Sequence, residues 1–166
     1  KVEFILGDIN STETVKRIGV CDVVLCSGVI YHTPNPLHMI MRLRGITGET
    51  LILNTASIPE IHGVKNSAVF YPYLDENQRQ IWNRGIGSQK GITGPYEPEE
   101  GYANWFWGMT PSCIESLLQT TGFEVIERHI FPFVCVFVCK AVNNKFTATS
   151  GEWTTPGDAD FSQFKR

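Results

Sequence analysis

The sequence predicts an α/β domain built on one mostly parallel sheet that ends in an antiparallel pair of strands. Over the first third of the chain, short apolar segments that suit buried strands alternate with segments of helical periodicity. Strand–helix–strand order of this kind places parallel strands side by side. The chain has 166 residues, of which 42% are hydrophobic and 19% charged, so it can bury one core and we expect no second domain.

Three strands and two helices are expected before residue 56. The strands are expected at residues 2–6, 23–26 and 50–55. Ser11 or Thr12 can cap a short helix, and Gly19 can end it. Pro36 suits the first turn of a second helix, which Gly45 is expected to end.

Residues 56–108 are expected to form a lid-like insertion. Regular periodicity fades there into Gly, Pro, Tyr and Trp, and so long an irregular connection usually has a function. Its aromatic side chains suit a lid over a flat or apolar substrate, and they suit equally a small satellite core that pins the insertion to the sheet. The glycine-rich residues 85–88 and 91–95 lack the setting of a phosphate loop, so we expect turns.

One helix and two strands are expected after the insertion. Thr110 can cap a helix that Gly122 closes. Residues 123–130 and 133–141 are strongly apolar and predict two antiparallel strands joined by a tight turn.

The composition changes near residue 142, where apolar residues give way to Asn, Thr, Ser, Gly and Asp. We therefore predict a domain at residues 1–142, which includes the insertion, and a flexible tail at residues 143–166. The net charge of -3 gives no reason to expect avid nonspecific binding to nucleic acids. The densest basic residues, Lys16, Arg17, Arg42 and Arg44, are expected on solvated helix faces.

Five cysteines, an odd number without repeated spacing, argue against a disulfide framework. Cys21, Cys26, Cys135 and Cys139 lie in apolar strand contexts and are expected to be free thiols that pack as small hydrophobes. The cysteines and histidines have no metal-ligand spacing, so we predict no metal site. Because no long apolar run or signal-peptide pattern occurs either, we expect a reduced, cytoplasmic protein that makes no membrane contact.

Residues 21–37 are the most informative part of the chain. A short buried strand passes there into a loop that contains Gly28, Tyr31 and His32. Ligands of open α/β sheets bind beyond the carboxyl ends of the strands. We therefore expect residues 26–32 to line a site.

This run contains the pattern Asp-Val-Val-x-Cys-x-Gly-Val-x-Tyr-His-x-x-x-Pro-Leu. The pattern resembles the motif after the fourth strand of class I S-adenosylmethionine (SAM) dependent methyltransferases of type 11/12, near the tRNA wobble-uridine carboxymethyltransferase-like group. Residues 2–9 resemble the third strand and acidic loop of this family, and residues 105–125 resemble its last helix entering the sixth strand. The resemblance covers residues 2–142 and implies a Rossmann-like sheet formed from strands 3 to 7 of the family.

The resemblance also implies which residues would bind SAM. Asp8 would meet the adenine amino group, with Ile9 beside it. Cys26 and Ser27 would border the methionine or adenosine part of the cofactor.

Other residues would serve the methyl transfer itself. Tyr31 would face the transferred group, and His32 would act either as a general base or as a support for its loop. Tyr102, Trp105 and Trp107 would line the substrate pocket as part of the lid.

Two features of the family are missing from this chain. The glycine-rich loop after the first strand and the acidic residue that ends the second strand are absent, so we interpret the chain as the C-terminal part of a longer protein, inactive by itself. The strand expected at residues 2–6 would then have no native neighbour, which favours poor stability or self-association through an unpaired sheet edge. No Arg or Lys lies between Tyr102 and Pro111 to pair with the extra carboxylate of carboxy-SAM, which favours ordinary SAM.

The sequence therefore predicts a methyltransferase that transfers a methyl group from SAM to a small molecule or a tRNA. One alternative is a noncatalytic methyltransferase-like scaffold or partner domain, which the missing glycine-rich loop favours. Against it, a scaffold has no need of the acidic loop at Asp8 or of residues 27–32. An oxidoreductase is disfavoured because no dinucleotide fingerprint is present.

Overall fold

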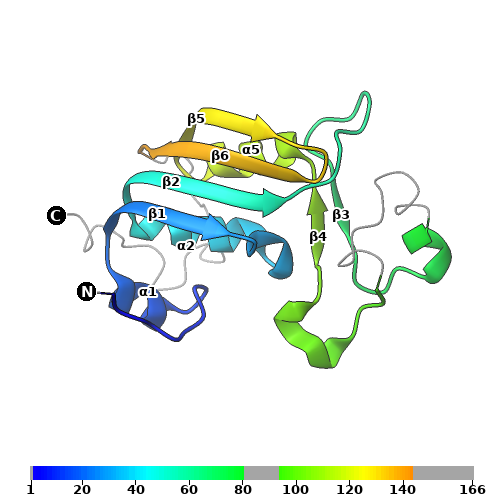
Figure 1. Ribbon diagram of the computed structural model, residues 1–166, viewed down its shortest axis with the longest axis horizontal. Helices are drawn as coiled ribbons and strands as arrows, with labels where there is room; N and C mark the ends of the chain where they lie inside the picture. The colour runs from blue at the N-terminus through cyan, green and yellow to red at the C-terminus, as the bar shows by residue number, and fades with distance from the viewer. Residues whose placement is uncertain (1, 81–93, 144–166) are drawn as a thin grey trace, which may run out of the picture.

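The computed structural model describes residues 2–80 and 94–143, and one main sheet dominates them (Figure 1). Its strands are β1 (Cys21–Ser27), β2 (Thr47–Ala56), β5 (Phe123–Ile130) and β6 (Val134–Ala141), in the order β1-β2-β6-β5. β1 and β2 are parallel, whereas β6 is antiparallel to both of its neighbours. The α/β class and the antiparallel C-terminal pair are confirmed, and parallel pairing within the described residues is confined to β1 and β2.

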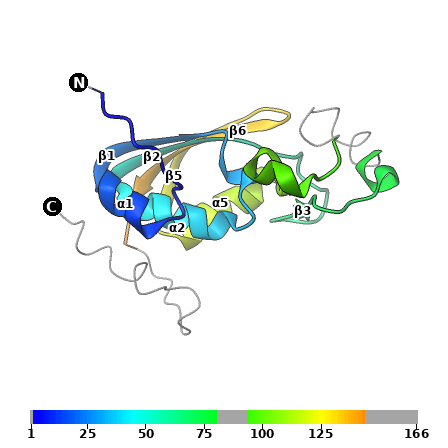
Figure 2. The same ribbon diagram turned by 90° about the horizontal axis from the view of Figure 1, so that it is seen from below.

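Three helices, α1 (Thr12–Ile18), α2 (Pro36–Ile46) and α5 (Pro111–Thr120), lie on one side of the main sheet (Figure 2). At the start of α2, the Asn35 side chain accepts a hydrogen bond from the His38 N–H at 3.1 Å. Gly45 does not end α2 as expected. The helix runs one residue further, and the hydroxyl of Thr47 donates to the Leu43 carbonyl at 2.7 Å, which closes the last turn.

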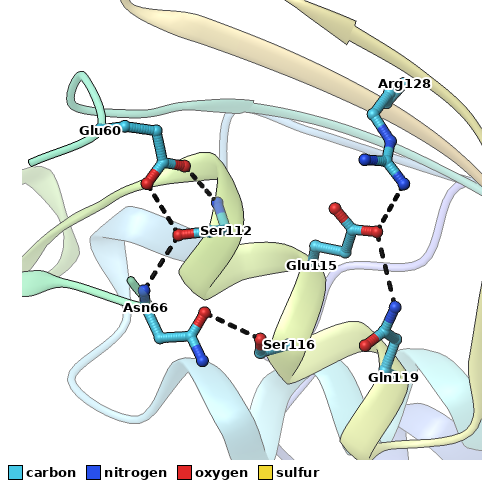
Figure 3. Close-up of polar contacts among 7 residues, drawn as sticks. All are labelled: Glu60, Asn66, Ser112, Glu115, Ser116, Gln119 and Arg128. Atoms are coloured by element: carbon cyan, nitrogen blue, oxygen red, sulfur yellow. Dashed lines mark hydrogen bonds and ion pairs between the residues drawn. The ribbon is translucent and has the colours of Figure 1, made fainter. Parts of the chain in front are cut away.

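The start of α5 is held by its own cap and by the loop between β2 and β3 (Figure 3). Thr110 caps the helix as predicted, because its hydroxyl oxygen accepts from the Cys113 N–H at 3.3 Å. The Glu60 carboxylate accepts from the backbone N–H of Ser112 at 2.7 Å and from its hydroxyl at 2.8 Å. The backbone N–H of Asn66 donates to the same hydroxyl at 3.0 Å. These contacts attach residues 60–66 to the helix.

The helices and the sheet enclose one hydrophobic core. Its almost fully buried side chains include Val15, Ile40, Leu51, Leu53, Ile114, Leu118, Phe123 and Phe137. They come from alternate positions of the strands and from the inner faces of the helices. Burial of one such side chain contributes about 1.5–3 kcal/mol, so this layer supplies most of the stabilisation.

The opposite face of the main sheet has no covering element among the residues that the structure describes (Figure 2). Val23 and Leu25 of β1 are 58% and 68% exposed, whereas the sequence predicts a strand covered on both faces. β1 also forms one edge of the sheet. An apolar edge strand of this kind is a template for pairing with another chain.

The strand expected at residues 2–6 is not formed. The segment pairs with no strand, and the side chains of Val2, Phe4 and Leu6 are 76%, 91% and 96% exposed. A strand requires a hydrogen-bonded neighbour, and an apolar sequence pattern does not supply one. This expectation was therefore wrong for the described chain.

The insertion contains a second, smaller sheet. β3 (Ala68–Phe70) pairs antiparallel with β4 (Trp107–Met109), beyond the carboxyl ends of β1 and β2 (Figure 1). Ile58 and Tyr71 are buried next to it, with Trp105 and Phe133 packed against them. This is the satellite core that the sequence allowed as the alternative to a lid.

Several sequence expectations lie outside the described residues. They are the turns at residues 85–88 and 91–93 and the tail from residue 144 onward.

All five cysteines are free thiols, and three of them, Cys26, Cys135 and Cys139, are buried. Among the helices that the structure describes, none combines the length and the apolar composition needed to cross a membrane.

Two arginines of α2 are not on a solvated face, contrary to expectation. Arg42 is 3% exposed and donates to Nε2 of His38 at 3.2 Å and to the Thr12 hydroxyl at 3.0 Å. Arg44 is half-buried and donates to three backbone carbonyls. Both side chains join separate elements, which a charge pattern along the sequence does not reveal.

Candidate functional site

The site begins where the parallel strands β1 and β2 end together. Ser27 is paired with Asn54, whose amide Nδ2 donates to the Ser27 hydroxyl at 3.2 Å. The Gly28 N–H donates to the Asn54 carbonyl at 2.9 Å. Gly28 has a φ of 72°, a left-handed conformation that favours glycine, and the chain turns there into a short 3-10 helix. The polar end of β2 thus holds the loop that follows β1.

That 3-10 helix, η1 (Ile30–His32), carries both residues expected to serve the methyl transfer. The Tyr31 carbonyl accepts from the Phe106 N–H at 2.9 Å, and the Tyr31 ring lies 4.3 Å from the Trp105 ring, centroid to centroid. The Trp107 indole N–H donates to the Pro34 carbonyl at 3.0 Å. Residues 105–107 therefore lie against η1 and the residues that follow it.

Asp8 lies in the loop before α1 and is exposed. Its Oδ1 accepts from the backbone N–H of Asn10 at 2.9 Å and from its side-chain amide at 3.1 Å. Its Oδ2 lies 3.5 Å from the Tyr102 hydroxyl, which belongs to η2 (Pro98–Ala103). The predicted adenine ligand and one predicted pocket residue are thus brought together across the fold.

His32 also contacts the segment after η2. Its Nδ1 lies 2.8 Å from the backbone carbonyl of Asn104, and its ring lies 4.1 Å from the Tyr31 ring and 6.2 Å from the Trp105 ring, centroid to centroid. Residues 102–105 of the insertion therefore contact three of the predicted site residues. Tyr102 reaches Asp8, Asn104 reaches His32, and Trp105 reaches Tyr31.

Two other predicted cofactor residues direct their side chains elsewhere. Cys26 is 6% exposed and belongs to the main core, and Ile9 is half-buried and packs against the same core. The Cys26 side chain is therefore closed to a ligand, which leaves only its backbone groups at the strand end. Ser27 is exposed, so its hydroxyl is the polar side-chain group that β1 itself offers there.

Burial disfavours the ionised form of two groups near the strand ends. It raises the pKa of the Cys26 thiol from 9.0 to about 11 and raises the pKa of the Tyr31 hydroxyl above 10.0. Both groups are therefore neutral near pH 7. A neutral, buried thiol is a poor nucleophile, which argues against covalent catalysis by Cys26.

The predicted pocket residues contribute ring surface more than free polar groups. The Trp107 N–H is used by the Pro34 carbonyl, and Trp105 also packs on the Tyr71 ring at 6.3 Å, centroid to centroid. Tyr102 is 56% exposed, and its hydroxyl faces Asp8. Flat walls of this kind suit a planar ligand.

Two residues that the sequence analysis did not single out, Asn54 and Asn104, organise the site. Asn54 follows the apolar run at residues 51–53 near the carboxyl end of β2, and this polar residue at a strand end was a signal that could have identified it. Asn104 lies in an irregular segment, and no periodicity or motif marks it. Its contacts depend on the folded chain.

The chain matches no protein-family model, and no curated protein is similar to it. It is similar to several solved structures at low identity. The N-terminal domain of EvdMO1 with SAH bound has 17% identity and a TM-score of 0.43, over 79% of this chain and 50% of that chain. Magnesium protoporphyrin IX methyltransferase (ChlM) from Synechocystis PCC 6803 with bound SAH has 16% identity and a TM-score of 0.42, over 74% of this chain and 46% of that one.

The CurJ carbon methyltransferase is a further similar structure, with 14% identity and a TM-score of 0.44, over 82% of this chain and 34% of that one. The chain thus spans about half, or less, of the length of the structures that it resembles.

Proposed function

We propose that this chain is part of a SAM-dependent methyltransferase, and that the loops beyond β1 form one wall of its cofactor and acceptor site. The observation that carries the proposal is the convergence of segments that resemble family motifs but lie far apart in the sequence. Asp8 and Tyr102 are 94 residues apart and meet at 3.5 Å, and His32 and Asn104 are 72 residues apart and meet at 2.8 Å. The segments that carry the resemblance are therefore also spatial neighbours.

The chemistry required of such a site is modest. In methyl transfer a nucleophile of the acceptor forms a bond to the sulfonium methyl group while the carbon–sulfur bond breaks, and its electron pair stays on sulfur. The protein contributes mainly by proximity and alignment. The walls formed by Tyr31, Trp105 and Trp107 would orient a flat acceptor, and Asp8 would accept a hydrogen bond from the adenine amino group.

The acceptor is proposed to be a small molecule or a tRNA, with ordinary SAM as the methyl donor. Between Tyr102 and Pro111 no cation is available to pair with the carboxylate of carboxy-SAM. Residues 1–166 alone are expected to be inactive, because they lack the glycine-rich loop that holds SAM in the family that the chain resembles. We expect the enzyme to work in the cytoplasm, where its five free cysteines would stay reduced.

The test is SAM binding measured by calorimetry on the full-length product of the gene that encodes this chain. Asp8→Ala removes a charged hydrogen-bond acceptor and should weaken binding roughly 10-fold or more. Glu13→Ala is the matched control, because it removes an exposed carboxylate from the neighbouring helix α1. It should leave the affinity within about two-fold, since an exposed group away from the ligand contributes little.

Residues 1–166 alone should show no SAM binding in the same experiment. If the full-length protein bound no SAM, the enzyme proposal would fall and the noncatalytic scaffold would replace it. If Asp8→Ala and Glu13→Ala weakened binding equally, the assignment of Asp8 to adenine would be wrong while the methyltransferase proposal stood.

A further inference from the structure

Asn104 is a buried asparagine whose side chain is fully engaged within its own turn. It is 6% exposed, and its Nδ2 donates to the carbonyls of Glu97 at 2.7 Å and Gly101 at 3.0 Å. Its Oδ1 accepts from the Glu97 N–H at 3.0 Å, and its own N–H donates to the Gly101 carbonyl at 3.2 Å. These bonds close residues 97–104 into one turn, so the position of the Asn104 carbonyl is fixed.

This carbonyl determines where His32 carries its proton. A carbonyl oxygen can only accept, so the nitrogen 2.8 Å away, Nδ1, must be the donor. Neutral imidazole has one N–H group, and with that proton on Nδ1 the lone pair is on Nε2. The contact with Asn104 therefore selects one tautomer of His32.

The Nε2 atom of His32 is open. It accepts no hydrogen bond in the part of the chain that the structure describes. It is also not one of the fully buried polar atoms without a partner, so solvent can reach it. The ring packs against the Tyr31 ring at 4.1 Å, and Tyr31 in turn packs against Trp105 at 4.3 Å, centroid to centroid, which leaves the His32 and Trp105 rings 6.2 Å apart. An oriented imidazole with a solvent-accessible lone pair is equipped to take up a proton.

We propose that Asn104 is a positioning residue that holds neutral His32 as the Nδ1–H tautomer, and that Nε2 accepts the proton of the methyl acceptor. This inference rests on the proposed function and deepens it, because it selects acceptors whose O–H or N–H group is methylated. The oxygen or nitrogen bonds to the methyl carbon, the carbon–sulfur electron pair stays on sulfur, and the acceptor proton moves to Nε2. The imidazolium keeps its Nδ1–H bond to the Asn104 carbonyl and later releases the new proton to water.

The tautomer can be read directly by ¹⁵N NMR of the full-length protein labelled in its histidine nitrogens. His32 is assigned by the signals lost in His32→Gln, and spectra are recorded at a pH where the histidines are neutral. Nδ1 of His32 should resonate in the range of a protonated nitrogen and Nε2 in the range of an unprotonated one. The opposite pattern in the wild-type protein would overturn the proposal without any variant.

Asn104→Ala should release the turn and shift His32 toward a mixture of tautomers. Asn104→Asp is the second variant, since it keeps the acceptor for the Glu97 N–H and removes both donors. Asn66→Ala is the matched control, because Asn66 also lies in a hydrogen-bonded turn but contacts Ser112 and Ser116 at α5 (Figure 3). If the tautomer of His32 were unchanged in both Asn104 variants, the positioning role of Asn104 would be refuted.

Diethyl pyrocarbonate, which acylates accessible unprotonated imidazole nitrogen, tests the open lone pair. His38 is the internal reference, because it is also half-buried but its Nε2 accepts from the Arg42 Nε–H at 3.2 Å. His32 should be modified roughly ten-fold faster than His38, whose lone pair must first lose a hydrogen bond to a charged donor. Equal rates, or faster modification of His38, would contradict an open Nε2.

Saturating SAM separates failure of this inference from failure of the proposed function. If the full-length protein binds SAM and SAM slows the modification of His32 but not of His38, Nε2 faces the cofactor site as proposed. If SAM binds without protecting His32, the proton-acceptor role is overturned and the methyltransferase proposal stands. If SAM does not bind, the proposed function fails, whereas the tautomer result remains a property of the fold.

Discussion

Replacing Arg44 by methionine should lower the free energy of unfolding substantially. Arg44 Nε donates to the carbonyls of Gly122 at 3.0 Å and Val142 at 3.2 Å, Nη2 donates to Val142 at 2.8 Å, and Nη1 donates to Thr47 at 3.1 Å. One guanidinium thus joins the end of α2, the turn after α5 and the end of β6. It also lies 5.8 Å from the centroid of the Phe123 ring.

The magnitude follows from these contacts. A hydrogen bond to a charged group contributes about 1.5–3 kcal/mol, so three carbonyls set an upper limit of roughly 5–9 kcal/mol. The loss is smaller because Arg44 is only half-buried and the Gly122 carbonyl keeps a second donor, the Val142 N–H at 2.9 Å. We expect Arg44→Met to lower the free energy of unfolding by about 2–4 kcal/mol. Arg44→Lys should recover less than half of this, because one ammonium cannot span three carbonyls.

The assay is denaturant unfolding of the full-length protein followed by tryptophan fluorescence, with the free energy obtained by linear extrapolation. Arg17→Met is the matched control, since Arg17 is exposed in the last turn of α1. The control should change stability by less than about 0.5 kcal/mol. A loss below about 1 kcal/mol for Arg44→Met, or equal losses for both variants, would refute the structural role of Arg44.

Three further changes test other parts of the fold. Thr110→Ala removes the cap of α5 and the hydrogen bond from the buried hydroxyl to the Ser67 carbonyl before β3. The free energy of unfolding should fall by about 1–3 kcal/mol in the same assay. An unchanged denaturant midpoint would argue against the cap. Burial and the Glu115 carboxylate raise the pKa of the Cys139 thiol to about 12, so Cys139 stays protonated at pH 8 and should be alkylated by iodoacetamide only after unfolding, as mass spectrometry would reveal. Alkylation in the native state would contradict its burial. Leu25→Lys on the exposed edge strand β1 should lower the self-association of residues 1–166 in sedimentation experiments. Val64→Lys, on an exposed loop, is the control and should leave self-association unchanged. A monomeric wild-type chain would contradict self-association through this edge.

Elements that depend on neighbouring residues were predicted well. Gly19, at a φ of 70°, ends α1 as expected, and Thr110 caps α5. The antiparallel pair at residues 123–130 and 133–141 forms within one residue of its predicted bounds. Capping, turns and alternation act over a few residues, so a local sequence contains the information that they need.

Elements that depend on a distant partner were predicted poorly. Residues 2–6 have the composition of a strand, but no strand pairs with them in the described chain. Arg42 and Arg44 have the charge of a solvated face, yet their partners lie in other elements. Gly45 has the identity of a helix terminator, but the hydroxyl of Thr47 closes the helix beyond it.

The sequence by itself determined the class of the fold, the cap of α5, the antiparallel C-terminal strands and the kinds of side chain near the ends of β1 and β2, although Ser11 makes no side-chain capping bond to α1. The tertiary structure alone decided which of those side chains meet. It brought Tyr102 to Asp8, placed the carbonyl of Asn104 at His32, turned Cys26 into the core and, among the described residues, left one face of the sheet uncovered. The physical reason is range: periodicity and capping are short-range properties of the chain, whereas a contact across 72 or 94 residues exists only once the helices and strands have packed.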